Sequence, residues 1–180
     1  MMTNTYGNPG MLYGNYIWPC ADILVQFINK NKYLFENKTV LEIGSGVHAL
    51  CGKKAAEVGA IVTITDGHAD IVARIDAPNC KVCKLEYGEI IGKYDIIIGA
   101  DVYYGGLNVD LFWKTIRESL NPGGKCYLAL EQRVLEKLNG EILEEISQND
   151  FDINQYDINI HQYIKNTKYI VCITNTFITL

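Results

Sequence analysis

The amino-acid sequence predicts an α/β fold: a three-layer, seven-stranded and mostly parallel sheet that ends in a C-terminal antiparallel hairpin. Two observations predict this fold. Apolar runs of strand length alternate with helical patterns over most of the chain, which is typical of a parallel sheet covered by helices on both faces. The chain then ends in two β-rich segments with no helix between them, as in an antiparallel pair.

The elements follow one another in a regular order. Residues 19–29 carry apolar side chains at helical spacing, and Pro19 is well placed to begin the helix. Residues 38–43 form a buried strand that runs into a glycine loop. The elements expected after the loop are a helix over 50–59, a strand over 60–66, a short helix over 69–75, strands over 80–86 and 94–100, a helix over 107–120 stopped by the Asn-Pro-Gly-Gly turn, a strand over 125–131, a helix over 133–148, and final strands over 151–160 and 167–177.

Length and composition indicate one globular domain over residues 1–180, with an N-terminal extension over residues 1–15. The net charge of −5 argues against general nucleic-acid binding, which needs a basic footprint. The N-terminus has no signal-peptide pattern, and no apolar run reaches the ~18 residues of a membrane span. We therefore expect reduced cysteines, a monomer that binds no membrane, and a cytoplasmic or nuclear location. The Cys80–Cys83 spacing lacks a second pair, so no metal site is expected.

Four predicted strands deliver glycines or acidic residues to the same edge of the sheet. Ligands of such sheets bind outside the carboxyl ends of the strands. The residues expected along this edge are the Gly44–Gly46 loop, Asp66, Glu86 and Asp101.

The glycine loop and Asp66 together indicate a nucleoside ligand. Gly44 and Gly46 fit a tight backbone turn beneath a ligand, although such a turn can also be purely structural. Asp66 lies twenty residues beyond Gly46, where a carboxylate can accept both ribose hydroxyls. NAD and S-adenosylmethionine both carry this ribose. Glu42 favours the cationic methyl donor, because a carboxylate would repel a pyrophosphate; the closing hairpin and the short chain favour it too.

Several motifs together resemble the seven-β-strand class I methyltransferases, specifically methyltransferase family 16, the non-SET protein methyltransferases that are mostly lysine-directed. The resemblance spans residues 16 to about 133. It rests on Tyr16-Ile17-Trp18-Pro19-Cys20-Ala21, Glu42-Ile43-Gly44-Ser45-Gly46, Thr65-Asp66-Gly67, Leu85-Glu86-Tyr87-Gly88 and Gly99-Ala100-Asp101-Val102-Tyr103-Tyr104.

The resemblance implies a Rossmann-like fold, S-adenosylmethionine as donor, no metal, and a protein substrate. It implies that Asp101 and Tyr104 form the target-residue pocket. The positions that it implies for the donor are Trp18 closing over it, Glu42 near its amino group, Gly44, Ser45 and Gly46 beneath its methionine and ribose, Asp66 and Gly67 at the ribose, Glu86 and Tyr87 at the adenine, and Ala100 beside the target pocket.

Other interpretations stay open at this point. Trp18 could instead be a core anchor and Tyr87 an exposed turn residue, whereas Tyr103 is expected to pack and His48 to be a plain loop residue. Val47 and His48 depart from the family's usual glycine loop. Some motifs look like a calmodulin-directed branch and others like an arginine-directed one, so no substrate protein is predicted. The alternatives to a lysine-directed enzyme are an arginine-directed one, a small-molecule or nucleic-acid methyltransferase, and a non-catalytic donor-binding module.

Overall fold

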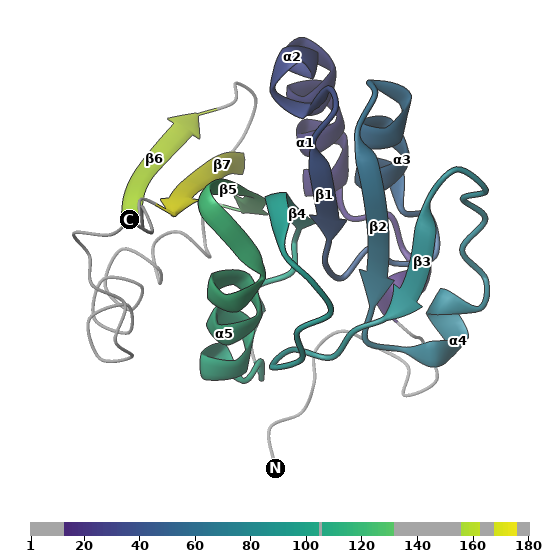
Figure 1. Ribbon diagram of the computed structural model, residues 1–180. Helices are drawn as coiled ribbons and strands as arrows, with labels where there is room; N and C mark the ends of the chain where they lie inside the picture. Colours follow the sequence, from purple (N-terminus) through teal and green to yellow (C-terminus); the bar gives the residue numbers. More distant parts are fainter. Residues whose placement is uncertain (1–12, 105, 132–155, 163–167, 176–180) are drawn as a thin grey trace.

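The structure, a computed structural model, describes residues 13–104, 106–131, 156–162 and 168–175. Five parallel strands lie side by side in the order β3-β2-β1-β4-β5 (Figure 1). Their bounds are β1 Thr39–Glu42, β2 Ile61–Asp66, β3 Lys81–Lys84, β4 Tyr94–Ala100 and β5 Leu120–Glu131. The predicted α/β fold with a parallel sheet is confirmed. In the structure β7 (Lys168–Asn175) pairs antiparallel with β5, and β6 (Tyr156–Gln162) pairs antiparallel with β7.

The helices lie on both faces of the sheet, as expected from the alternating pattern. Their bounds are η1 Tyr13–Asn15 (a 3₁₀ turn), α1 Pro19–Lys30, α2 Lys32–Phe35, α3 Leu50–Glu57, α4 Ala69–Val72 and α5 Val109–Ser119. The sequence did not predict η1 or α2, which are too short to show a helical period. The helix predicted over 133–148 lies outside the described residues. Among the described ranges, no helix has the length and apolar character that crossing a bilayer requires.

The end of α4 and the start of β5 differ from the predicted bounds by three and five residues. The α4 helix ends at Val72 and not at Ile75, because the N–H groups of Arg74 and Ile75 bond to carbonyls three residues back, a tighter turn than the α-helix. The β5 strand begins at Leu120, so that the predicted Asn-Pro-Gly-Gly turn lies inside it. Its pairing with β4 jumps from Leu120 to Lys125, which makes the four intervening residues an irregularity in the ladder.

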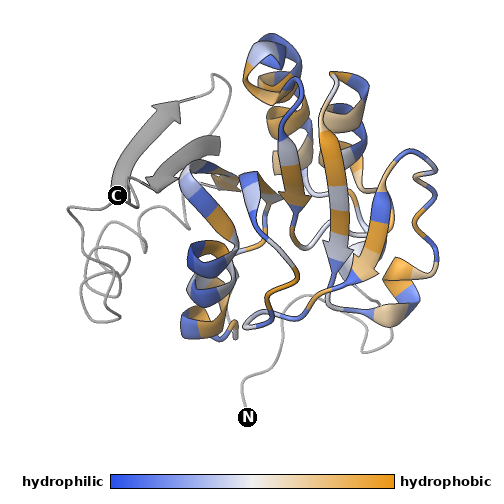
Figure 2. Cartoon of the chain, viewed as in Figure 1, coloured by the Kyte–Doolittle hydropathy of each residue, from blue (hydrophilic) through white to orange (hydrophobic). Residues whose placement is uncertain are grey.

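Each face of the sheet has its own apolar core. Side chains alternate along a strand, so neighbouring residues such as Val40 and Leu41 are buried on opposite faces. Val40 packs with residues of α1 and α3, and Leu41 packs with residues of α5. Figure 2 shows the apolar colouring concentrated in the strands and on the inward side of the helices.

The order in which the strands are added to the sheet reverses between β1 and β4. The β2 and β3 strands extend the sheet on one side of β1, whereas β4 and β5 extend it on the other. At such a reversal the loops that leave the carboxyl ends of the two central strands diverge and leave a crevice for a ligand. The expected site residues follow β1, β2, β3 and β4 at this edge.

Candidate methyl-donor and target site

The glycine loop after β1 is tied to the end of β2. Gly44 and Gly46 have positive φ values of 58° and 61°, a conformation that favours glycine. Ser45 donates its backbone N–H to the Thr65 carbonyl at 2.9 Å, and Gly46 donates its own to Asp66 Oδ2 at 3.0 Å. The loop and Asp66 are therefore held together, as the sequence predicted for neighbouring strand ends.

Asp66 is oriented by backbone groups on both sides. Its Oδ1 accepts the His68 N–H at 2.9 Å, while Oδ2 accepts the Gly46 N–H. A carboxylate oxygen can accept more than one hydrogen bond, so each oxygen keeps capacity for a hydroxyl of a bound molecule. Gly67, next to it, is exposed.

The glycine loop joins α3 at Ala49. This residue is the N-cap of α3 and has a left-handed φ of 46°. Val47 donates its backbone N–H to the Gly14 carbonyl at 2.8 Å, whereas the His48 side chain is exposed. The departure from the usual loop is therefore a change of the turn, and His48 is a surface residue as expected.

Glu42 lies beneath α3. Its side chain is 3% exposed, and the backbone amides of Cys51 and Gly52 face its carboxyl group. Burial raises the pKa of this carboxyl from 4.5 to about 8, although the two amides and Lys53 act in the opposite direction. Oε2 is buried and has no hydrogen-bond partner among the described residues. A Cβ on Gly52 would lie 2.4 Å from Oε2, so only glycine leaves room there.

Glu86 and Tyr87, which follow β3, have different surroundings. The Glu86 side chain is exposed and forms an ion pair with Lys84. The Tyr87 ring packs edge-on against Phe112 at 5.1 Å between centroids, and a Cβ on Gly44 would lie 3.3 Å from the Tyr87 hydroxyl. Burial strongly raises the pKa of this phenol. Tyr87 is thus a packed side chain beside the glycine loop and not an exposed turn residue.

The turn after β4 brings Asp101 to the start of α1. Asp101 has a left-handed φ of 54°, and its N–H bonds to the Ala129 carbonyl of β5 at 2.9 Å. Its Oδ2 accepts the backbone N–H of Cys20 at 3.2 Å, so the carboxylate caps α1 from a distant part of the chain. Ala100, the last residue of β4, is half-buried.

The two tyrosines of this turn separate as the sequence predicted. Tyr103 is buried and packs on Phe112 and Trp113, with ring centroids 5.5 and 6.3 Å away. Tyr104 is 60% exposed. Partial burial and the negative charge of Asp66 raise the pKa of the Tyr104 phenol, which keeps it protonated at neutral pH.

The segment before α1 packs on the glycine loop, a contact that the sequence did not predict. Gly14 binds Val47, and a Cβ on Gly46 would lie only 2.9 Å from the Gly14 oxygen. Asn15 accepts a bond from Arg74 beyond α4 at 2.7 Å. A 3₁₀ turn of three residues carries no periodic signal, so only the fold could place it here.

Trp18 is half-buried at the N-cap of α1 and is not a core anchor. Its indole N–H donates to the Tyr13 carbonyl at 3.3 Å, and its ring contacts Tyr16 edge-on at 5.3 Å. Trp18 therefore fixes the segment that lies over the glycine loop, next to the bond between Cys20 and Asp101.

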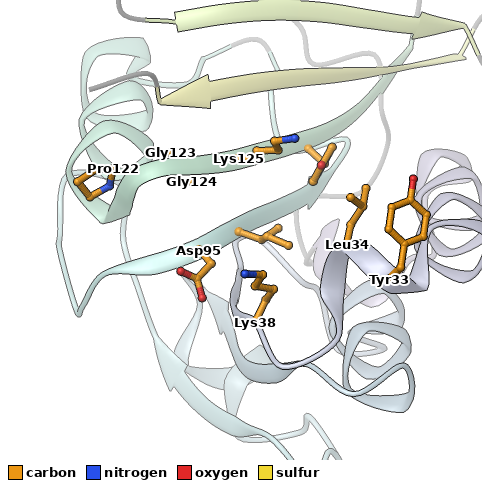
Figure 3. Close-up of a pocket in the computed structure, with 10 residues that line it drawn as sticks. Tyr33, Leu34, Lys38, Asp95, Pro122, Gly123, Gly124 and Lys125 are labelled. Atoms are coloured by element: carbon orange, nitrogen blue, oxygen red, sulfur yellow. The ribbon is translucent and has the colours of Figure 1, made fainter. Parts of the chain in front are cut away.

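A hollow of about 350 Å³ lies at the opposite, amino edge of the sheet (Figure 3). It opens between Tyr33 and Leu34 on one side and the Pro122–Gly124 segment on the other, with Lys38 and Asp95 at its lining. Asp95 binds the N–H and hydroxyl of Thr39 at 3.0 and 2.9 Å. Asp95 thus joins the starts of β4 and β1, and the hollow is separate from the predicted site.

The geometry at the carboxyl edge agrees with what is found among known proteins. A family model described as lysine methyltransferase, methyltransferase family 16, matches residues 5–149. The chain belongs to methyltransferase family 16. Among curated proteins, it is 30% identical to the protein N-lysine methyltransferase METTL21A of Danio rerio over 83% of this chain and 77% of that protein. It is 36% identical to the histone-arginine methyltransferase METTL23 of Rattus norvegicus over 51% of this chain and 47% of that protein.

The fold of this chain also matches solved structures. A methyltransferase from Pyrococcus furiosus shares 25% sequence identity, with a TM-score of 0.64 over 93% of this chain and 91% of that chain. The chain spans about half the length of the histone-arginine methyltransferases that it matches, 47% of the rat protein and 51% of the Xenopus laevis protein.

The residues of this family 16 chain fit the family's methyl donor. The exposed Gly44 lacks the side chain that would meet Val102 at 2.9 Å, and Asp66 offers an oriented carboxylate beside it. Tyr87 supplies an aromatic ring next to the same loop. The Glu42 carboxyl group faces Cys51 and Gly52 at the start of α3, and its place near the donor's amino group stays a prediction.

Proposed function

We propose that the chain is an S-adenosylmethionine-dependent protein methyltransferase that modifies a lysine side chain. The observation that carries this proposal is the position of Asp101 and Tyr104. They follow β4, the direct neighbour of β1, and the glycine loop follows β1 at the same edge. The glycine loop and the turn that carries Asp101 and Tyr104 are therefore adjacent. The similarity to the lysine-directed METTL21A supports the choice of lysine.

The donor would lie along the edge formed by β1, β2 and β3. Gly44, Ser45 and Gly46 would pass beneath it, Asp66 and Gly67 would bind its ribose, and Tyr87 would stack beside its adenine. S-adenosylmethionine supplies, when bound, a methyl group activated by a sulfonium. Trp18 would close the site through η1, which rests on the glycine loop. Glu86 would border the adenine from its exposed position, and Ala100 would line the boundary with the target pocket.

The target pocket has to accept an amine in its neutral form. A free lysine has a pKa of about 10.4, so deprotonation at neutral pH is costly without help from the site. A target side chain that packs on the Tyr104 ring would lose part of its hydration, which disfavours the ammonium form, although a carboxylate at Asp101 would act the other way. Asp101 can accept an amine N–H and orient its lone pair. The Tyr104 phenol is protonated and can donate a hydrogen bond, but it does not take up the proton. We assign the proton to water.

Arginine is the second candidate target. The rat METTL23, which is 36% identical over half of this chain, is a histone-arginine methyltransferase. The same pocket, with an acidic residue and a hydroxyl, can hold a planar guanidinium.

Several broader features belong to the same proposal. The pairing of β7 with β5 and of β6 with β7 supports a seven-stranded sheet with a closing antiparallel hairpin. We further propose a single domain over residues 1–180, a monomer in the cytoplasm, and a protein substrate in place of nucleic acid or membrane. The net charge of −5 supports the absence of general nucleic-acid binding.

The test uses a matched pair of variants at Asp101. The full chain is incubated with cell lysate and radiolabelled S-adenosylmethionine, and the modified residue is identified by mass spectrometry. Asp101→Asn keeps an oxygen that can accept the Cys20 N–H, so α1 should stay capped while labelling is lost. Asp101→Ala should also lose labelling and in addition become less stable by about 1 kcal/mol.

Donor binding is measured separately by calorimetry. We expect both variants to bind S-adenosylmethionine like the wild type. If Asp101→Asn labelled the substrate as strongly as the wild type does, the role of Asp101 would be refuted. If the wild type did not bind S-adenosylmethionine, the proposed function would be refuted. A labelled arginine in place of lysine would favour the second candidate.

A further inference from the structure

Exposed apolar side chains gather at the carboxyl edge of the sheet, on both sides of Asp101. Before α1, Tyr13, Tyr16 and Ile17 are 51%, 57% and 42% exposed, and after β4, Tyr104 is 60% exposed. We name these four residues the aromatic rim. Monomeric proteins seldom expose several large apolar side chains together without a partner for them.

The fold brings the two halves of the aromatic rim together. The bond from the Cys20 N–H to Asp101 Oδ2 joins the start of α1 to the turn that carries Tyr104. Tyr16 contacts Trp18, two residues before Cys20, and Trp18 binds the Tyr13 carbonyl. The aromatic rim therefore flanks Asp101 from the start of α1 and from the turn after β4, and the positions of Tyr13 and Tyr16 are fixed by their contacts with Trp18.

The charged side chains of these two segments are all acidic, although Arg74 from beyond α4 binds Asn15 of the first segment. Residues 13–22 and 101–110 contain the three acidic residues Asp22, Asp101 and Asp110 and no lysine or arginine. Asp22 and Asp110 lie in the first turns of α1 and α5, and both are exposed. An exposed aromatic face beside carboxylates attracts cations, because the carboxylates are negatively charged and the ring face carries partial negative charge.

We propose that the aromatic rim binds a positively charged peptide segment that flanks the target side chain of the protein substrate. This inference rests on the proposed function and specifies its substrate class. Arginine or lysine side chains of the segment lie on the faces of Tyr13 and Tyr16, and Asp22 and Asp110 provide long-range attraction. The aromatic rim thereby selects targets by the charge of their surroundings.

The test measures peptide binding by fluorescence anisotropy with the full chain. The probes are three labelled peptides with one central lysine, flanked by arginines, glutamines or glutamates. The arginine peptide should bind at least tenfold more tightly than the glutamate peptide at low salt, and this difference should shrink as salt is added. Equal binding of the three peptides would overturn the proposal.

Matched variants locate the surface. Tyr16→Ala should lower the affinity for the arginine peptide about two- to fivefold. Tyr16→Phe keeps the ring and should bind this peptide like the wild type. Tyr33→Ala is the control, because Tyr33 is 70% exposed but lines the hollow at the opposite edge. An equal loss in Tyr33→Ala and Tyr16→Ala would overturn the proposal. So would a concentration-dependent dimer that Tyr16→Ala abolishes, because a second copy would then cover the aromatic rim.

Failure of this inference and failure of the proposed function give different results. Lysate labelling and donor binding without discrimination among the peptides would overturn the role of the aromatic rim alone. Peptide discrimination without donor binding or labelling would overturn the proposed function and leave the binding surface supported.

Discussion

The buried carboxyl group of Glu42 makes the stability of the protein depend on pH. The pKa of this group is about 8 in the folded chain, against 4.5 for an exposed glutamate. Below pH 4.5 the group is protonated in both the folded and the unfolded chain and has no effect. Above pH 4.5 the unfolded chain ionises first, so the free energy of unfolding falls until the pH passes the folded pKa.

The size of the effect follows from the two pKa values. Between them the free energy of unfolding falls by up to about 1.4 kcal/mol per pH unit, and this slope halves as the pH reaches the folded pKa of about 8, which gives a loss of about 2 kcal/mol from pH 6 to pH 8. Glu42→Gln keeps the size and polarity of the side chain but cannot ionise. We therefore expect the Gln variant to gain about 2 kcal/mol relative to the wild type over this pH interval.

The assay is urea unfolding followed by circular dichroism at pH 6, 7 and 8. Glu36→Gln, at an exposed glutamate that follows α2, is the control and should leave the pH dependence unchanged. If the free energies of unfolding of the wild type and Glu42→Gln changed equally with pH, the reasoning would be refuted. The pKa of Glu42 would then be the same in the folded and the unfolded chain, and the buried group would be ionised at neutral pH.

Three further substitutions test other contacts. Gly52→Ala should lower the free energy of unfolding by about 1–3 kcal/mol in urea titrations, because its Cβ would lie 2.4 Å from the Glu42 carboxyl. Asp95→Ala should cost about 1–3 kcal/mol at neutral pH, because it removes the bonds to Thr39. Those bonds lower the Asp95 pKa, so its contribution is present at neutral pH and is lost on acidification, which repeating the titration at pH 3 checks. Gly46→Ala should weaken S-adenosylmethionine binding in calorimetry, because its φ of 61° and the nearby Gly14 oxygen both disfavour a side chain.

The sequence predicted the order of the elements well where patterns were long and unbroken. The strand predicted over 94–100 has the same bounds as β4, because a run of apolar residues between polar ends leaves little choice of register. The glycine loop and Asp66 were likewise placed together, since parallel strands carry their ends to one edge.

The details that the sequence missed depend on contacts between distant segments. The place of Glu42 near the donor's amino group stays a prediction, but the burial of its carboxyl group beneath α3 was not foreseen; it shares the α3 face with Val40 because residues two apart in a strand point the same way. This alternation along the strand could have predicted that Glu42 faces α3. The contact of Gly14 with the glycine loop and the cap of α1 by Asp101 had no such signal, because neither leaves a periodic pattern.

The cap of α1 by Asp101 also bears on how the chain assembles during synthesis. The Cys20 N–H and its acceptor are separated by 81 positions, and β4, which presents the acceptor, pairs directly with β1. While only the first hundred residues have left the ribosome, the chain includes all of β4 but not Asp101, so the start of α1 lacks its hydrogen-bond partner. Contacts so far apart in sequence form late and slowly. The nascent chain therefore completes this contact at the carboxyl edge only after residue 101 has been translated, and a ribosome stalled before that point would carry a fragment with an uncapped first helix.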